Sequence, residues 1–473
     1  MSRSRNWLKI SCIGCVGAPC LALLLGAGIV KCQADRIGNQ LPVELAKLKS
    51  MGIATEPEEL LPNPPIPDAE NAAEHYKKIF AAADKAAGLG KSTDATLLSN
   101  YTGHPSDTAS YEAVLKRYQP VFDLAAELPE FKKYAPKRKY EDGFDLLFPE
   151  FSKMKELVKR ESSRTRYLLD KGRKREALQA IEVQYAVSDH LAMEPSLIGA
   201  LVCIAINAIA NVNLDIFLES IQNDGALLAE TEKMLQRHTA IPDFRRVMEG
   251  ELILSRTSFE KIKSGEDLSA LLGQDSGPMT VDTAIDRVTL GNESFRRMFQ
   301  AKQVEAYRRM FEMLPKDRTD WVAINESMKK FSAQIEADTS VANRMNQIMF
   351  PVFDQATIAF AKMEAQNRVA LLAVKLLRMR PLGLPRDLSA FGRLAIDPLV
   401  GKPMGYVRKG DGFKVWSVGQ DLHDDGGRKR APGLSANDTD FVMGYRIGFP
   451  SPTRKAVSLP AGSPGAVPGA LGP

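Results

Sequence analysis

The 473-residue chain is long enough for two or three domains or for one long helical array, and its 44% hydrophobic and 26% charged residues are ordinary for a globular protein. A net charge of +5 is small for this length, and only 7% of the residues are aromatic, so the composition excludes a general nucleic-acid-binding surface. Beyond residue 30 the only cysteines are Cys32 and Cys203, which excludes a disulfide framework as the source of stability.

The N-terminal stretch predicts the location of the protein. Residues 10–30 contain no charged side chain and match the length that a helix needs to cross a bilayer. Arg3, Arg5 and Lys9 precede this stretch, which keeps the N-terminus in the cytoplasm. We therefore expect residues 1–35 to form a cytoplasmic stub and an uncleaved transmembrane helix of a bacterial inner membrane, with the bulk of the chain in the periplasm. A cleaved signal peptide is the alternative.

Residues 36–380 predict an irregular multi-helix domain of helical hairpins, solenoid-like and extracytoplasmic. A proline-rich spacer over residues 61–67 interrupts any helix, and a capped helix is expected to start at Asp68. From there, apolar residues recur at three-to-four spacing in most segments. The helices predicted by this spacing are Ser110–Leu128, Phe151–Leu169, Lys174–Leu191, Ala226–His238, Asp243–Lys263, Glu293–Leu314, Asp320–Asp338 and Phe350–Met379, and a shorter one precedes the spacer at Leu41–Met51.

Leu197–Ala210 is apolar almost all round, which is typical of a centrally buried helix. At about 14 residues it is too short to span a bilayer. Together with the helix before it, at Lys174–Leu191, it predicts an antiparallel helical hairpin.

Signatures of catalysis are not found in the sequence. Gly88-Leu-Gly-Lys-Ser92 resembles the end of a phosphate-binding loop, but Lys85 stands where that motif needs its first glycine, so no nucleotide site is predicted. The five histidines are too widely spaced for a paired helical metal site. We therefore predict no catalytic residues and no cofactor site, which favours a non-enzymatic protein. A hydrolase with dispersed catalytic residues is an alternative, and a polar, acid-lined cleft in the helical domain would favour it.

A small C-terminal β module is predicted over residues 381–447. Pro381 breaks the last long helix, and strands are expected at Pro403–Val407, Phe413–Val418 and Asp440–Ile447, in an antiparallel sheet with a glycine-containing turn over Lys409–Gly412. Residues 448–473 consist mostly of Pro, Gly, Ala and Ser and are expected to form a disordered tail. The fold class is thus mainly α, with this module as its only sheet.

Carboxylates and glycines gather after the second predicted strand. Calcium takes six to eight oxygen ligands, and glycines allow backbone carbonyls to turn inward. The residues expected to hold a calcium ion are Ser417, Asp421, Asp424, Asp425, Asp438 and Asp440. The alternative is a hairpin whose aspartates and glycines serve only the turn, and the basic run Arg428–Arg430 favours that alternative.

Two resemblances follow from these residues. The run Ser417–Asp421, continued by Asp424–Gly427, resembles the C-terminal region of the major pseudopilin of type II secretion, in which the corresponding loop holds calcium. The pseudopilin processing site is absent, since Asn6-Trp7-Leu8-Lys9 stands in its place, so a fibre subunit is not implied. The same C-terminal region and the pattern PxPDxENAAxxY at Pro65–Tyr76 resemble uncharacterised membrane-anchored proteins of planctomycete-type bacteria.

These observations favour a single-pass, membrane-anchored envelope protein that acts as a structural or interaction protein. Its partners would be the membrane, through residues 10–30, and another protein of the envelope, with no nucleic acid or nucleotide. An accessory component of a type II secretion or pilus-like system is the first alternative, and the hydrolase is the second.

Overall fold

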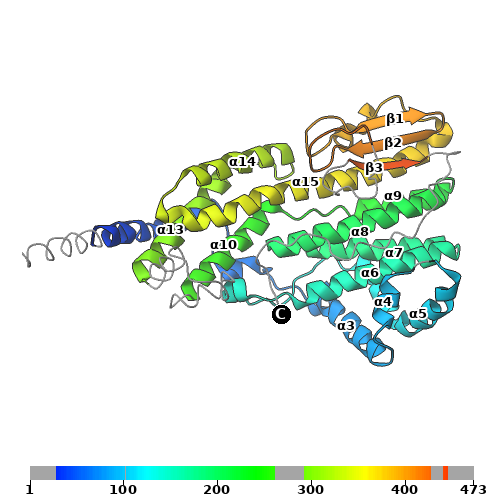
Figure 1. Ribbon diagram of the computed structural model, residues 1–473, viewed down its shortest axis with the longest axis horizontal. Coiled ribbons are helices and arrows are strands. Elements are labelled where there is room, and N and C mark those ends of the chain that lie inside the picture. Colours follow the sequence, from blue (N-terminus) through cyan, green and yellow to red (C-terminus); the bar gives the residue numbers. More distant parts are fainter. Residues whose placement is uncertain (1–27, 102, 262–291, 428–439, 446–473) are drawn as a thin grey trace, which may run out of the picture.

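The computed structural model describes residues 28–101, 103–261, 292–427 and 440–445. It confirms a mainly helical protein with one small antiparallel sheet (Figure 1). The α-helices are α2 (Leu41–Ser50), α3 (Ala72–Gly88), α4 (Asp94–Ser99), α5 (Pro105–Ala125), α6 (Pro149–Asp170), α7 (Lys174–Leu191), α8 (Leu197–Ile221), α9 (Gly225–Arg237), α10 (Phe244–Lys261), α13 (Glu293–Met313), α14 (Trp321–Ala337) and α15 (Arg344–Met379). Short 3-10 turns connect several of them, among them η4 (Tyr140–Asp145) and η7 (Ser389–Ala395).

Helices α6, α7 and α8 form the centre of the molecule and lie side by side (Figure 1). The connections between them are short, so each helix packs antiparallel to the one before it, and the predicted α7–α8 hairpin is present. Helix α15 runs along the other side of α8 and contacts α9 and α14 as well. Helix α7 consequently buries most of its length, polar residues included.

The predicted length of the buried helix was wrong. Helix α8 runs from Leu197 to Ile221, 25 residues in all, because the polar residues that break its apolar run are satisfied inside the core. Asn211 accepts a hydrogen bond from Tyr185, and Asn213 donates one to Gln184. Buried amides with partners do not end a helix. Among the described residues, α8 is the one helix long and apolar enough to cross a membrane, and half of that stretch is buried inside the protein.

The start predicted for the helix after the proline spacer was also misplaced. Residues Asp68–Glu70 form a 3-10 turn, and α3 begins only at Ala72. The side chain of Asn71 caps it by accepting a hydrogen bond from the N–H of Ala73 at 3.1 Å. At its other end, α3 stops at Gly88, so the Gly88–Ser92 run is a helix end followed by a turn.

The sheet has the order β1 (Gly405–Lys409), β2 (Gly412–Ser417), β3 (Phe441–Tyr445). The strands β1 and β2 form a hairpin in which Lys409 pairs with Gly412 across the turn Gly410–Asp411. Gly410 has a φ of +62°, the left-handed conformation that this position of a tight hairpin turn requires. The antiparallel pairing of β2 with β3 aligns Ser417 with Phe441.

The sheet shares a hydrophobic core with the helices. Phe413, Val415 and Met443 pack in one cluster with residues of α8 and α15. Tyr445 adds a polar tie, because its hydroxyl donates to Asp215 Oδ1 of α8 at 2.8 Å. Strand β3 therefore lies next to the helices, whereas β1 forms the outer edge of the sheet (Figure 1). The predicted membrane helix lies mostly outside the described residues, and the structure begins with a helical stretch over residues 28–38. The predicted tail over 448–473 lies entirely outside the described residues.

Candidate functional site: a charged pocket beside helix α7

A pocket of about 420 Å³ opens where α9 and α15 meet the connections that follow α9 and precede α14. Its size is that of a small-molecule site. The lining combines apolar side chains with both signs of charge: Tyr185, Leu235, His238, Thr239, Ile241, Pro242, Asp243, Arg318, Thr319, Trp321, Glu364, Asn367, Arg368, Leu371 and Leu394.

One acid–base pair in the lining is fixed in place. Glu364 and Arg368 lie one turn apart on α15 and form an ion pair, and the indole N–H of Trp321 also donates to Glu364. Arg368 donates further to the carbonyl oxygens of Ile396 at 2.7 Å and Arg393 at 3.0 Å. Both side chains of the pair are at most 15% exposed, so this pair is part of the wall of the pocket.

The second pair lies at the rim. Asp243 accepts hydrogen bonds from the backbone of Arg245 and forms an ion pair with Arg318. The Arg318 side chain is 57% exposed and that of Asp243 is 35% exposed. Exposed ion pairs contribute little to stability, so this pair can open at low cost.

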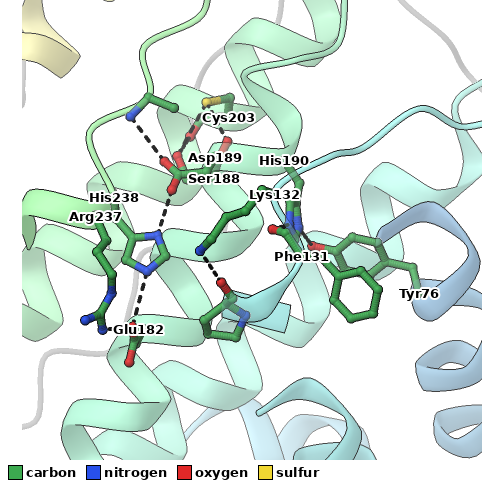
Figure 2. Close-up of polar contacts among 12 residues, drawn as sticks. Tyr76, Phe131, Lys132, Glu182, Ser188, Asp189, His190, Cys203, Arg237 and His238 are labelled. Carbon is green, nitrogen blue, oxygen red and sulfur yellow. Dashed lines mark hydrogen bonds and ion pairs between the residues drawn. The ribbon is translucent and has the colours of Figure 1, made fainter. Parts of the chain in front are cut away.

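His238 connects the pocket to two partly buried carboxylates of α7. Figure 2 shows its ring between Asp189 and Glu182, with Nδ1 2.7 Å from Asp189 Oδ2 and Nε2 3.4 Å from Glu182 Oε1. Burial alone lowers the pKa of His238, but the hydrogen bonds and charges of the two carboxylates outweigh burial and raise that pKa above its ordinary value. Both ring nitrogens thus face acids, and the raised pKa favours the charged imidazole, in which both nitrogens donate and neither can accept a proton as a general base.

The neighbouring polar residues of α7 are structural. Nε2 of His190 lies 3.0 Å from the carbonyl oxygen of Phe131, and Nδ1 lies 2.9 Å from the Tyr76 hydroxyl (Figure 2). The Phe131 carbonyl oxygen requires Nε2 to donate, and burial lowers the pKa of His190 to about 4, so the ring is neutral near pH 7 and Nδ1 accepts from the Tyr76 hydroxyl. Burial also raises the pKa of the Cys203 thiol to about 12, which keeps it protonated and unreactive beside Ser188.

In the loop predicted to hold calcium, the carboxylates of Asp424 and Asp440 accept hydrogen bonds from the loop itself and from strand β2. Asp440 accepts from the N–H groups of Gly427 at 2.8 Å and Asp425 at 3.3 Å. Asp424 accepts from the Trp416 indole at 2.8 Å and from Gly426 at 2.9 Å. The side chains of the aspartates therefore organise the turn.

The remaining predicted ligands are scattered around this turn. Asp421 accepts from the N–H of His423 at 3.1 Å, and the hydroxyl oxygen of Ser417 is buried without a hydrogen-bond partner among the described residues. Asp438 lies outside the described residues. Within the described ranges, no three His, Cys, Asp or Glu side chains are grouped so as to hold a metal ion. Calcium binding at this loop stays a prediction.

The pocket was not predicted from the sequence. Its charged residues come from the connection after α9, the connection before α14 and the middle of α15, so more than a hundred positions separate His238 from Arg368. A local spacing rule cannot find the Asp243–Arg318 pair across such a distance. The one available signal is Glu364 followed by Arg368, the one-turn spacing of a helical ion pair.

Comparisons with known proteins do not supply an identity. No protein-family model matches the chain, and no curated protein or solved structure has significant similarity to it.

Proposed function

We propose that this protein is a membrane-anchored, non-enzymatic binding protein of a bacterial envelope, and that the pocket beside α7 receives a small zwitterionic molecule. The charged and apolar halves of the lining carry this proposal. The acids in the lining, Asp243 and Glu364, are each paired with an arginine, so the pocket offers charged groups of both signs for recognition.

The rim pair supplies the recognition. A ligand carboxylate can replace Asp243 on the exposed guanidinium of Arg318, and a ligand ammonium can take the carboxylate of Asp243. An amino acid or the end of a short peptide presents both groups close together. The apolar part of such a ligand would lie against Trp321 and Leu371, which line the same pocket.

The hydrolase alternative has less support. A polar cleft with acids is present in the helical part, but Glu364 is held by Arg368 and Trp321, and His238 has both nitrogens engaged. The anchored, periplasmic location is supported by the apolar, charge-free residues 10–30 and by the resemblance to membrane-anchored planctomycete-type proteins. The pseudopilin-like loop supports the secretion-accessory alternative, in which the same protein would bind a component of that machine.

The decisive experiment is calorimetric titration of the detergent-purified full chain with free amino acids and dipeptides. The matched ligands are analogues that carry only the carboxylate or only the amine. We expect saturable binding of at least one zwitterion, weakened at least tenfold by Arg318→Ala and unchanged by Arg175→Ala, an exposed arginine of α7 outside the pocket. Equal binding of singly charged analogues, or no binding at all, would contradict the proposal.

Two further measurements separate the alternatives. Ester or peptide hydrolysis by the purified chain that disappears in His238→Gln would favour the hydrolase. Recovery of the full chain in alkaline carbonate-washed membranes, and its release when residues 1–33 are removed, is the result expected for an uncleaved anchor.

A further inference from the structure

The outer edge of the sheet is a candidate interaction surface. Strand β1 pairs only with β2 among the described strands, and Val407, Arg408 and Lys409 are exposed. The free edge lies on the side of the sheet away from β3 and the helices (Figure 1). Unpaired backbone groups on such an edge are a template for an additional strand.

The hairpin register shows which backbone groups face outward. Lys409 and Gly412 close a two-residue turn and therefore exchange hydrogen bonds with each other, and this pattern repeats at every second residue. The N–H and C=O groups of Tyr406 and Arg408 consequently point away from β2. Two residues earlier, the N–H of Met404 faces the same way and donates to the carbonyl oxygen of Ala395 at 2.7 Å. No described residue makes such a backbone hydrogen bond to Tyr406 or Arg408.

A pocket of about 550 Å³ adjoins this edge. Its lining comes from η7, from the residues that flank η7, and from the start of β1 with the two residues before it, and it includes Leu388, Ala395, Ile396, Met404 and Tyr406. Tyr406 is held in the wall because its hydroxyl donates to the carbonyl oxygen of Pro385 at 3.0 Å. A strand added to β1 would therefore have an apolar pocket for a side chain beside its backbone contacts, which is the usual division between affinity and specificity in strand addition.

The charge around the edge defines the partner. The exposed bases Arg386, Lys402, Arg408 and Lys409 outnumber the exposed acids Asp387 and Asp411. Lys402, Arg408 and Lys409 form no ion pair with a described residue, and Arg408 donates only to the carbonyl oxygen of Leu384. A second copy of β1 would bring a second set of these bases to the same edge, and the repulsion between like charges disfavours it. An acidic segment has the complementary charge.

We propose that the edge of β1 and the adjoining pocket bind an acidic, extended peptide segment of a partner protein by strand addition. Charged residues on an edge also serve to prevent aggregation, but that role alone does not require a pocket at the end of the free edge. The site is separate from the pocket beside α7, so each can fail without the other.

The test uses the detergent-purified full chain and a labelled hexapeptide in which valine alternates with aspartate or glutamate, followed by fluorescence anisotropy at two salt concentrations. The matched probe is the same peptide with lysine at the acidic positions. We expect saturable binding of the acidic peptide only, at least tenfold weaker for Arg408→Glu and weaker at high salt. Arg408→Pro should also weaken binding, because it removes an outward N–H that the native hairpin does not use.

Controls make the result decisive. Arg175→Glu on α7 changes the charge equally and should leave peptide binding unchanged, and thermal melts should show that each variant is folded. Three outcomes would overturn the proposal. They are no saturable binding of the acidic peptide to the folded chain, binding of the lysine peptide as tight as that of the acidic peptide, and binding by Arg408→Glu and Arg408→Pro as tight as that by the native chain. Self-association in sedimentation that Arg408→Glu abolishes would overturn it in favour of a second copy as the occupant.

Discussion

The imidazole of His238 is held by two carboxylates of a single helix, Asp189 on Nδ1 and Glu182 on Nε2 (Figure 2). These acids are seven residues apart on α7, which is two helical turns, so they lie on the same face. Arg237 also pairs with Glu182, and the N–H of Ala240 lies 3.3 Å from Asp189. The connection after α9 is thereby attached to the central helix at the edge of the pocket.

His238→Gln should therefore destabilise the protein, by roughly 2–4 kcal/mol, because it leaves the partly buried Asp189 without its cation and Glu182 with Arg237 alone. The raised pKa of His238 fixes the sign of the pH dependence. Its contribution is fully present below the unfolded pKa of about 6.5 and is lost as the pH rises through the folded pKa. Urea unfolding of both proteins between pH 6 and 9 should show the difference shrinking with rising pH. His423→Gln, in an exposed loop, should change little at any pH; a constant difference for His238→Gln would argue against a charged ring.

A close contact between α10 and the α7–α8 turn provides a second prediction. A Cβ atom on Gly250 would lie 1.6 Å from the carbonyl oxygen of Pro195, far inside the contact distance. Gly250→Ala should therefore destabilise the protein by about 2–5 kcal/mol, although alanine is the better helix former by about 1 kcal/mol. Gly225→Ala at the start of α9 is the matched control, since nothing lies within 4 Å of its added Cβ. Thermal and urea unfolding should show a loss for the first variant and no loss for the second; equal stability would mean that the turn can move aside.

Helices and strands of this protein follow from local pattern to a large extent. The period of apolar residues places α7 at its observed bounds, and the Lys409–Gly412 turn fixes the hairpin. The start of α3 and the end of α8 were missed for a local reason. Asn71 caps the first, and buried amides such as Asn211 carry the second past its apolar run, and neither role is visible without the partner atoms.

The pockets could not be predicted because they depend on long-range packing. The wall formed by Glu364 and Arg368 becomes part of a site only where Trp321, from a different helix, reaches it. The outward face of Arg408 was fixed by the hairpin, but its significance depends on η7 lying beside β1, which no residue pattern indicates. Strand register and helix period are encoded locally, whereas a cavity is encoded by the arrangement of several elements.

Glu251 provides a prediction in which replacement by glutamine should raise the stability, whereas His238→Gln should lower it. This carboxyl of α10 accepts a hydrogen bond from the N–H of Leu197 at 2.7 Å, and burial raises its pKa to about 7. A carboxyl with a raised folded pKa contributes stability below its unfolded pKa, near 4.5, and loses it as the pH rises through 7. Glu251→Gln keeps the acceptor and removes the charge. It should therefore be more stable than the native chain by roughly 1–3 kcal/mol at pH 8 and nearly equal at pH 5.

The comparison requires unfolding of both proteins by urea at pH 5, 6.5 and 8. Glu260→Gln is a suitable control, because this exposed acid at the end of the same helix should give no gain at pH 8. A difference that does not vary with pH would show that the Glu251 carboxyl is not protonated in the folded protein near neutrality.

The calcium prediction for the C-terminal loop can be tested by calorimetric titration and thermal melting. If the loop binds calcium, the ion must draw Asp424 and Asp440 away from part of their hydrogen bonds to the turn, so binding should be in the micromolar-to-millimolar range and should raise the melting temperature. Asp421→Ala combined with Asp425→Ala should abolish the calorimetric signal. Asp411→Ala, an exposed acid in the β1–β2 turn, should leave it unchanged. Identical melting temperatures with calcium and with a chelator would mean that Asp424 and Asp440 serve only the turn. Their hydrogen bonds from the N–H groups of Gly426, Gly427 and Asp425 already hold the turn without an ion.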